Sequence, residues 1–338
     1  MSVFLLPIIW YLLICAALAL YVLLDGANLG SGILSLFPQK EEQRASMLST
    51  LSPIWNANET WLLVAAGTLF GAFPAVYSIG LNALYAPGVV ILIGLLLRAV
   101  SFEFHAYAVN KAFWSWVFGI GSLVTAIGHG LAVGGLLSGI TIVDGHFGGG
   151  AFDWVTPLTL LITIGTVSSY MVLGYAYLIG RMQYENQQQT FSRLLFVAGL
   201  TFIALLGSTV FLPKTNYIFL TRWTSIPSMY YLGMIALLIA IFSLLLAYYV
   251  FKKIHPERLY QLCLSIFALG FVGMLIGTYP YMIPPYLTLF DAASPNSTLA
   301  FMLWGVGPIL PIILGYNYYL HKIFSGTTNV REESYEDA

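Results

Sequence analysis

The sequence predicts an all-α integral membrane protein. Lys, Arg, Asp and Glu make up only 8% of its 338 residues, whereas a soluble domain carries about 25% charged residues. Hydrophobic residues make up 59%, and the mean hydropathy is +0.84. This little charge excludes a soluble enzyme, a disordered chain and a nucleic-acid-binding protein, which needs a basic face. The apolar runs are long and uninterrupted, unlike the alternating segments of about ten residues that build a transmembrane barrel.

Nine apolar runs are predicted to span the membrane, because a bilayer core requires about 20 apolar residues per helix. The second run is short and ends at Pro74, so we expect a tight turn to join it to the third. The polar segment 39–50 is interpreted as a surface linker. Residues 1–324 then form a single polytopic membrane domain, and 325–338 form a polar cytoplasmic tail. The nine runs are 7–36, 57–74, 76–105, 112–140, 155–180, 191–211, 228–252, 259–279 and 299–323.

The distribution of basic residues predicts the orientation of these spans, since Lys and Arg concentrate in cytoplasmic connections. With nine spans, ten of the 13 basic residues fall on one side, two fall on the other, and Arg98 lies inside a span. The N-terminus is therefore expected outside and the C-terminus in the cytoplasm. The ten are Lys40, Arg44, Lys111, Arg181, Arg193, Lys252, Lys253, Arg258, Lys322 and Arg331; the two are Lys214 and Arg222.

Ionisable groups within the predicted spans gather toward the cytoplasmic side of the membrane. Such groups are costly in a bilayer and are usually functional. Asp25, Glu59, Arg98 and Glu103 all fall in the inner half or at the inner edge, and Asn28, Asn56 and Asn58 lie at the same level. The outer half of these helices carries nothing comparable.

Two compatible interpretations fit this cluster. In the structural one, Arg98 pairs with one carboxylate, because an unpaired buried arginine costs several kcal/mol, while Trp55 and Asn28 support the packing. In the functional one, Asp25, Glu59, Glu103, Asn56 and Asn58 belong to a hydrated path for cytoplasmic protons. Asp25 has no basic residue near it in sequence, so we expect it to be the less paired acid and the one that titrates.

His129 is the one histidine expected near the middle of the bilayer, in a segment rich in glycine. Small neighbours leave room for a haem, so axial ligation is one interpretation; a hydrogen-bonded histidine at a helix contact is the other. No second histidine lies at the same depth, and no Cys/His cluster suggests another metal site. We therefore expect no cofactor or metal bound by ligands of this chain.

Five segments, in this order, resemble subunit II of the cytochrome bd-type quinol oxidases. The resemblance runs over the whole chain, and the combination of segments is far more specific than any one of them. They are DGANLGSGIL (Asp25–Leu34), PIWNANETWLLVAAGTLFGAFPAVY (Pro53–Tyr77), LLLRAVSFEFH (Leu95–His105), SYMVLGYAYLIGR (Ser169–Arg181) and YPYMIPPYLTLFDAASPNSTLAFML (Tyr279–Leu303).

The resemblance implies one subunit of a terminal respiratory oxidase in a bacterial or archaeal cytoplasmic membrane. Such complexes oxidise quinol and reduce dioxygen to water, and thereby contribute to the proton motive force. The resemblance places three haems in a partner, subunit I, and gives subunit II two four-helix bundles, a peripheral helix and no haem ligand. It also allows small single-span accessory subunits and a structural quinone or lipid. In such a complex this chain would stabilise subunit I and contribute to proton supply.

The chain departs from the family pattern at two polar positions. Asn28 and Asn56 stand where the family commonly has acids, and the acid at position 56 has been proposed as a member of the proton path. A route through position 56 is therefore in doubt for this chain, and Asp25 and Glu59 become the stronger candidates.

Two other classes of protein compete with the oxidase subunit. A secondary transporter would use broken helices around a site at the bilayer midplane, whereas the charged cluster here lies near the inner edge. A self-sufficient haem protein would need more histidines at bilayer depth than His129 alone.

Overall fold

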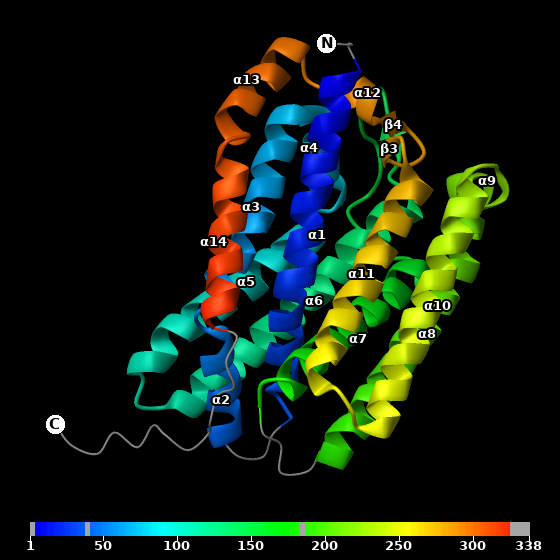
Figure 1. Ribbon diagram of the computed structural model, residues 1–338. Coiled ribbons are helices and arrows are strands. Elements are labelled where there is room, and N and C mark those ends of the chain that lie inside the picture. The colour runs from blue at the N-terminus through cyan, green and yellow to red at the C-terminus, as the bar shows by residue number, and fades with distance from the viewer. Residues whose placement is uncertain (1–3, 38–40, 183–186, 325–338) are drawn as a thin grey trace.

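The computed structural model describes residues 4–37, 41–182 and 187–324, and within these ranges the chain is almost entirely helical (Figure 1). The predicted polar tail, 325–338, lies outside the described residues. The helices are α1 (Leu5–Leu34), α2 (Glu41–Leu51), α3 (Trp55–Ala72), α4 (Pro74–Ala83), α5 (Tyr85–Tyr107), α6 (Lys111–Ser138), α7 (Pro157–Ile179), α8 (Gln187–Thr215), α9 (Tyr217–Thr224), α10 (Ser228–Lys252), α11 (Pro256–Thr278), α12 (Leu289–Ala292), α13 (Asn296–Val306) and α14 (Ile309–Ile323).

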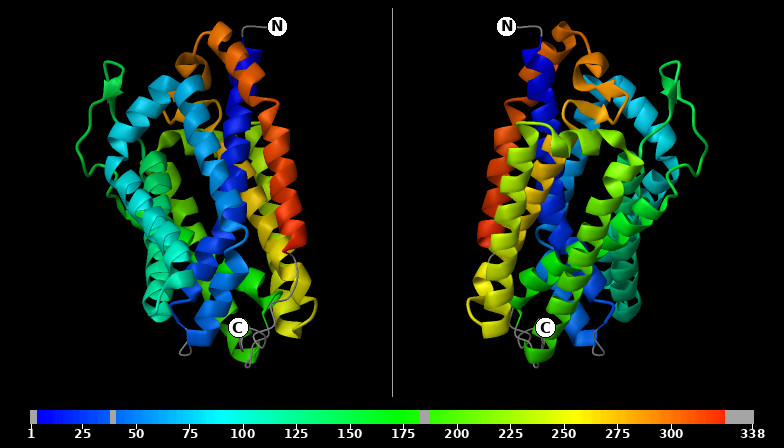
Figure 2. Two further views of the ribbon diagram at one scale, coloured as in Figure 1. Left: turned by 90° about the vertical axis from the view of Figure 1, so that its left-hand side faces the viewer. Right: turned by 90° about the vertical axis from the view of Figure 1, so that its right-hand side faces the viewer.

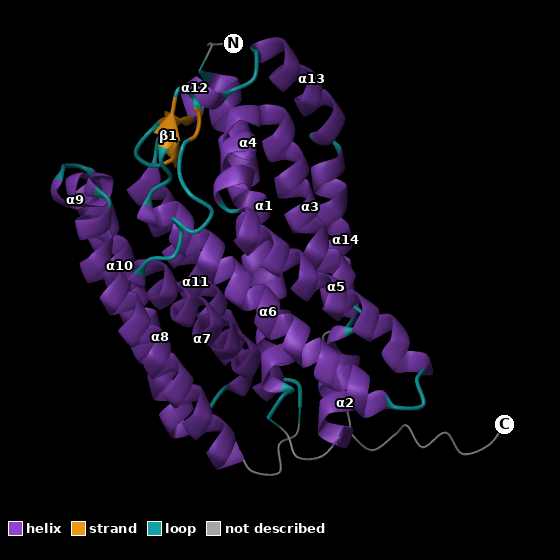
Figure 3. Cartoon of the chain, turned by 180° about the vertical axis from the view of Figure 1, so that it is seen from behind, coloured by secondary structure: helices purple, strands orange, loops and turns teal. Residues whose placement is uncertain are grey.

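The long helices pack as two four-helix bundles with a peripheral helix, as expected (Figures 1 and 3). The first bundle contains α1, α3, α5 and α6, and the second contains α7, α8, α10 and α11. Contacts of α7 with α1 and α6 join the two bundles. The pair α13–α14 lies at the edge of the first bundle, where α13 packs against α1 and α3.

Within the described residues, eight helical segments are long and apolar enough to cross a membrane, with α13 and α14 counted as one segment. A ninth span results if α3 and α4 are counted as one broken helix, although their axes differ by 118°. The predicted number of about nine spans therefore agrees with the structure, but the second one is bent.

The predicted tight turn after the second span is wrong, because residues 74–83 form a separate short helix, α4. Pro74 has no N–H to extend the hydrogen-bond ladder of α3, and Phe73 leaves the helical region at φ −136° and ψ 65°. A second break at Leu84 separates α4 from α5. The third span therefore starts at Tyr85 rather than at residue 76.

The predicted surface linker at 39–50 is also wrong over its described part, where α2 forms a helix that packs against the first bundle. Met47, Leu48 and Leu51 on one side of α2 are buried. One turn earlier on this side, Arg44 donates to the Ser35 carbonyl at 3.1 Å and lies over the Trp116 ring. Because most residues of α2 are polar, its buried face was not apparent from the sequence.

A close approach between α1 and α7 joins the two bundles. A Cβ atom added to Gly30 would lie 1.7 Å from the carbonyl oxygen of Tyr170, and one added to Gly174 would lie 2.4 Å from the backbone of Gly30. Small residues allow such contact between membrane helices. The contact holds the C-terminal part of α1, which carries Asp25 little more than one turn away, against the second bundle.

Short strands and loops cover one end of the bundles (Figure 2). The hairpin β1–β2 (Ile142–Val143 and His146–Phe147) follows α6, and the hairpin β3–β4 (Tyr281–Ile283 and Leu287–Thr288) follows α11. Ile283 and Leu289 are fully buried beneath this cap. The Trp10 indole donates to the Leu299 carbonyl at 2.9 Å, so the start of α1 is fixed to α13.

Candidate functional site: a buried arginine shared by two acids

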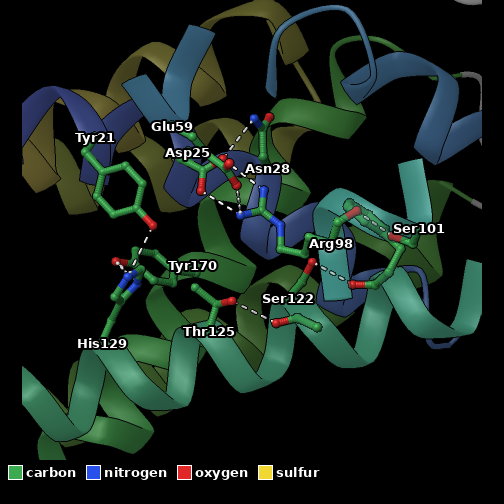
Figure 4. A network of polar contacts seen from close by, with 12 residues as sticks. Tyr21, Asp25, Asn28, Glu59, Arg98, Ser101, Ser122, Thr125, His129 and Tyr170 are labelled. Carbon is green, nitrogen blue, oxygen red and sulfur yellow. Dashed lines mark hydrogen bonds and ion pairs between the residues drawn. The ribbon is translucent and has the colours of Figure 1, made fainter. Parts of the chain in front are cut away.

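Arg98 pairs with two carboxylates inside the first bundle (Figure 4). Its two terminal nitrogens contact the two carboxylate oxygens of Asp25 at 2.9 and 3.0 Å. Its Nη1 also lies 3.0 Å from Oε1 of Glu59. The bidentate geometry with Asp25 is the strong form of this interaction, whereas Glu59 makes a single contact. We call Asp25, Glu59 and Arg98 the acid–arginine triad.

The side chains of the triad are almost completely buried. The side chains of Arg98 and Asp25 are 0% exposed, while that of Glu59 is 19% exposed. Asn28 donates to Oδ1 of Asp25 at 3.2 Å. Oδ1 of Asn28 and Nε of Arg98 have no hydrogen-bond partner among the described residues. A hydrated site would satisfy both atoms, since buried polar groups are costly when they stay unpaired.

Three helices bring the triad together: α1 carries Asp25, α3 carries Glu59 and α5 carries Arg98. Close packing of α5 on α6 holds Arg98 inward, because a Cβ added to Gly94 would lie 2.5 Å from the backbone nitrogen of Thr125. Trp55 stacks on Phe102 with ring centroids 4.9 Å apart. This aromatic pair lies one helical turn from Glu59 on α3 and from Arg98 on α5.

Of the residues singled out in the sequence, Asp25, Glu59, Arg98 and Asn28 come together, and the others lie apart. Asn56 and Glu103 are exposed on α3 and α5. Asn58 is buried but faces α14, where its Oδ1 lies 3.0 Å from Nε2 of His321. The expected pairing was wrong in one respect: Asp25 is the more tightly paired acid, because it contacts both terminal nitrogens of Arg98, and Glu59 is the less paired one.

The contact between α14 and the first turn of α3 was not apparent from the sequence. Besides the His321 contact, Asn317 donates to the Ala57 carbonyl at 3.0 Å. These contacts join residues about 260 positions apart, and nothing local predicts them. They fasten the peripheral helix to the turn that carries Glu59.

His129 lies on α6 between two phenol hydroxyls, near the triad (Figure 4). Its Nε2 is 3.2 Å from the Tyr21 hydroxyl, and its Nδ1 is 3.4 Å from the Tyr170 hydroxyl. Tyr21 precedes Asp25 by one turn of α1. Because both ring nitrogens face hydroxyl groups, this geometry does not fit axial ligation of a haem, which needs a ring nitrogen directed at the iron. Among the described residues, no group of three His, Cys, Asp or Glu side chains could hold a metal ion.

Replacing His129 with alanine should leave intact the haem absorption bands of the complex that the resemblance implies. The imidazole contacts two tyrosine hydroxyls, so its loss removes two hydrogen bonds, at about 0.5–1.5 kcal/mol each. The optical spectrum of the purified complex checks this expectation, and the midpoint of thermal unfolding should fall modestly. Loss of one haem band from a complex that still assembles would show that His129 ligates iron.

Comparisons with known proteins agree with this architecture. The chain matches the family model described as cytochrome bd terminal oxidase subunit II over residues 6–324. It is 26% identical to cytochrome bd-I ubiquinol oxidase subunit 2 of Escherichia coli strain K12, covering 95% of this chain and 94% of that protein. It is 25% identical to cytochrome bd ubiquinol oxidase subunit 2 of Bacillus subtilis strain 168, covering 96% and 97%.

A solved structure supports the same fold. The chain resembles one in the bd oxidase of Geobacillus thermodenitrificans with a TM-score of 0.75 and 17% identity, over 94% of this chain and 98% of that one. At this identity the likeness concerns the fold alone. It matches an all-helical membrane architecture, in agreement with the two bundles described above.

The fold and the buried triad define a polytopic helical membrane subunit with two acids and an arginine paired inside its first bundle. The chain belongs to the family of cytochrome bd terminal oxidase subunit II. It is therefore a subunit of a terminal quinol oxidase, an oxidoreductase complex of bacterial membranes, and works with a partner, subunit I. The expected family and enzyme class are confirmed, and the secondary-transporter alternative is not supported.

Proposed function

We propose that this chain stabilises the haem-bearing subunit I and conducts protons from the cytoplasm through Glu59 and Asp25. The observation that carries the proposal is that the buried guanidinium of Arg98 contacts Asp25 with both terminal nitrogens and Glu59 with only one. Electron transfer belongs to the partner in this proposal: subunit I holds the three haems and oxidises quinol, and this chain contributes no haem ligand. A structural quinone or lipid and small single-span accessory subunits are compatible with the exposed apolar faces.

The charge balance of the triad supports a proton-carrying role. With both carboxylates ionised the triad has a net charge of −1, and one proton makes it neutral. Arg98 stays paired with Asp25 whether or not Glu59 holds this proton, because both terminal nitrogens contact Asp25 and only Nη1 also contacts Glu59. Glu59 is also the one partly exposed member of the triad. Glu59 therefore accepts the proton from the aqueous side, and Asp25 lies next along the route.

The direction of proton transfer follows from the orientation that we propose, with the N-terminus outside. Reporter fusions should place the connections at Lys40, Lys111 and Lys253 in the cytoplasm and those at Asp144 and Asp291 outside. The reason is the ten-to-two distribution of basic residues. A reporter at residue 253 that is active outside would reverse the orientation and, with it, the side from which the triad draws protons.

Asp25→Asn tests the proposed function in the assembled oxidase. The variant preserves side-chain size and leaves Arg98 paired with Glu59, so the complex should assemble with an unchanged haem spectrum. Arg98 then keeps Glu59 as its one acidic partner in the triad, and the proposed route loses its second carboxyl group. Oxygen consumption with excess quinol should therefore slow severalfold. Assembly together with a wild-type rate would mean that Asp25 is structural and that protons travel through the partner.

A further inference from the structure

The two bundles carry different net charges at one end of the protein. This is the end with the connections α1–α3, α5–α6, α7–α8 and α10–α11. Counted from the sequence over these connections and the one or two helix turns beside them, the first bundle carries three basic and three acidic residues, whereas the second carries five basic and two acidic residues. The former are Lys40, Arg44, Lys111, Glu41, Glu42 and Glu103; the latter are Arg181, Arg193, Lys252, Lys253, Arg258, Glu185 and Glu257. The general preference for cytoplasmic cations does not explain why one bundle is balanced and the other has a net charge of +3.

On α8, an exposed arginine stands at the end of an exposed apolar stripe. Arg193 lies in the second turn of the helix, and Phe196, Leu200 and Ile203 follow it at helical spacing on the same face. These three side chains are 75%, 38% and 66% exposed.

The neighbouring helix α10 carries a matching stripe. It ends at Lys252, which is exposed, and Tyr248, Leu245 and Ile241 precede it on one face with exposures of 52%, 39% and 42%. The helices α8 and α10 contact each other and run side by side (Figures 1 and 3). Each stripe extends about 15 Å from its cation at 1.5 Å per residue, which is about half the thickness of a bilayer core.

We propose that the α8–α10 face binds an anionic phospholipid, with the headgroup at Arg193, Lys252 and Arg258 and the acyl chains along the two stripes. Arg258 is exposed at the start of α11, directly after the connection from α10. The cations fit a phosphate, and the apolar stripes fit hydrocarbon over the depth of one leaflet. A soluble anion would use only the cations, so the paired stripes select a lipid. This inference does not depend on the proton path.

The test measures the lipid retained by the assembled oxidase. The complex is exchanged into vesicles of phosphatidylcholine with increasing phosphatidylglycerol, re-extracted in detergent, and examined by native mass spectrometry. We expect phosphatidylglycerol to be retained in preference to phosphatidylcholine. The variant Arg193→Gln/Lys252→Gln/Arg258→Gln should lower its apparent affinity by roughly a hundredfold. Lys111→Gln, at the same end of the balanced bundle, is the matched control and should bind as the wild type does.

Three outcomes would overturn the proposal. The wild-type complex could show no preference for the anionic lipid, a result that needs no variant to fold. The triple variant could retain phosphatidylglycerol as the wild type does. Lys111→Gln could lose as much lipid as the triple variant, which would show attraction to the whole charged surface instead of a site on α8 and α10.

Discussion

Replacing Arg98 with alanine should prevent assembly of the oxidase. The change leaves Asp25 and Glu59 in the bundle without a counter-charge, and removing one partner of a buried ion pair costs about 3–5 kcal/mol. That loss is a large part of the total stability of a typical domain, about 5–15 kcal/mol. Membranes should contain little of the complex, as measured by the recovered subunits and by the haem content after purification.

Two comparisons separate the charge effect from general damage. Lys111→Ala removes an exposed cation from the same bundle and should leave assembly unchanged. The triple variant Asp25→Asn/Glu59→Gln/Arg98→Met carries no buried charge in the triad and should recover much of the assembly, but not the turnover. Normal yield from Arg98→Ala alone would contradict the ion-pair geometry, because two buried carboxylates would then tolerate the loss of their cation.

Replacing Glu59 with glutamine should lower oxygen consumption by at least about tenfold while leaving the complex assembled. The Asp25–Arg98 pair survives the change, since its two contacts do not involve Glu59. What is lost is the partly exposed carboxylate that takes up the proton, and a positioned acid or base typically contributes at least about a hundredfold to the step that it serves. Steady-state turnover and the haem spectrum of the same preparation give both quantities.

Glu42→Gln is the matched control for this variant. Glu42 is an exposed acid on α2, and no hydrogen bond or ion pair joins it to the triad among the described residues. The Glu42→Gln variant should consume oxygen at the wild-type rate. Equal slowing of both variants would attribute the effect to surface charge rather than to the triad.

The sequence was sufficient to predict the spans because hydropathy and helix length act locally. The prediction failed where one or two residues decide the local geometry. Phe73 and Pro74 break α3 and start α4, and the apolar run itself does not reveal the angle between them. Leu48 and Leu51 make α2 a packed helix, although its average composition is that of a linker.

The members of the triad could be predicted, but their pairing could not. Buried ionisable residues are rare enough in membrane helices that Asp25, Glu59 and Arg98 stand out in the sequence. Which carboxylate receives both terminal nitrogens of Arg98 depends on how α1, α3 and α5 face one another. That information is not local, since Asp25 and Arg98 are 73 residues apart.

The central claim, that Glu59 and Asp25 bring protons from the cytoplasmic side, is tested most directly by timing proton uptake. The fully reduced complex is mixed with oxygen in a single turnover, and a pH-indicator dye and the haem absorbance are followed together. In Glu59→Gln, we expect oxygen binding and the first oxidation of the haems to keep their wild-type rates, while proton uptake slows at least about tenfold. Proton uptake at the wild-type rate in an assembled Glu59→Gln complex would contradict the account and place the proton route in the partner subunit.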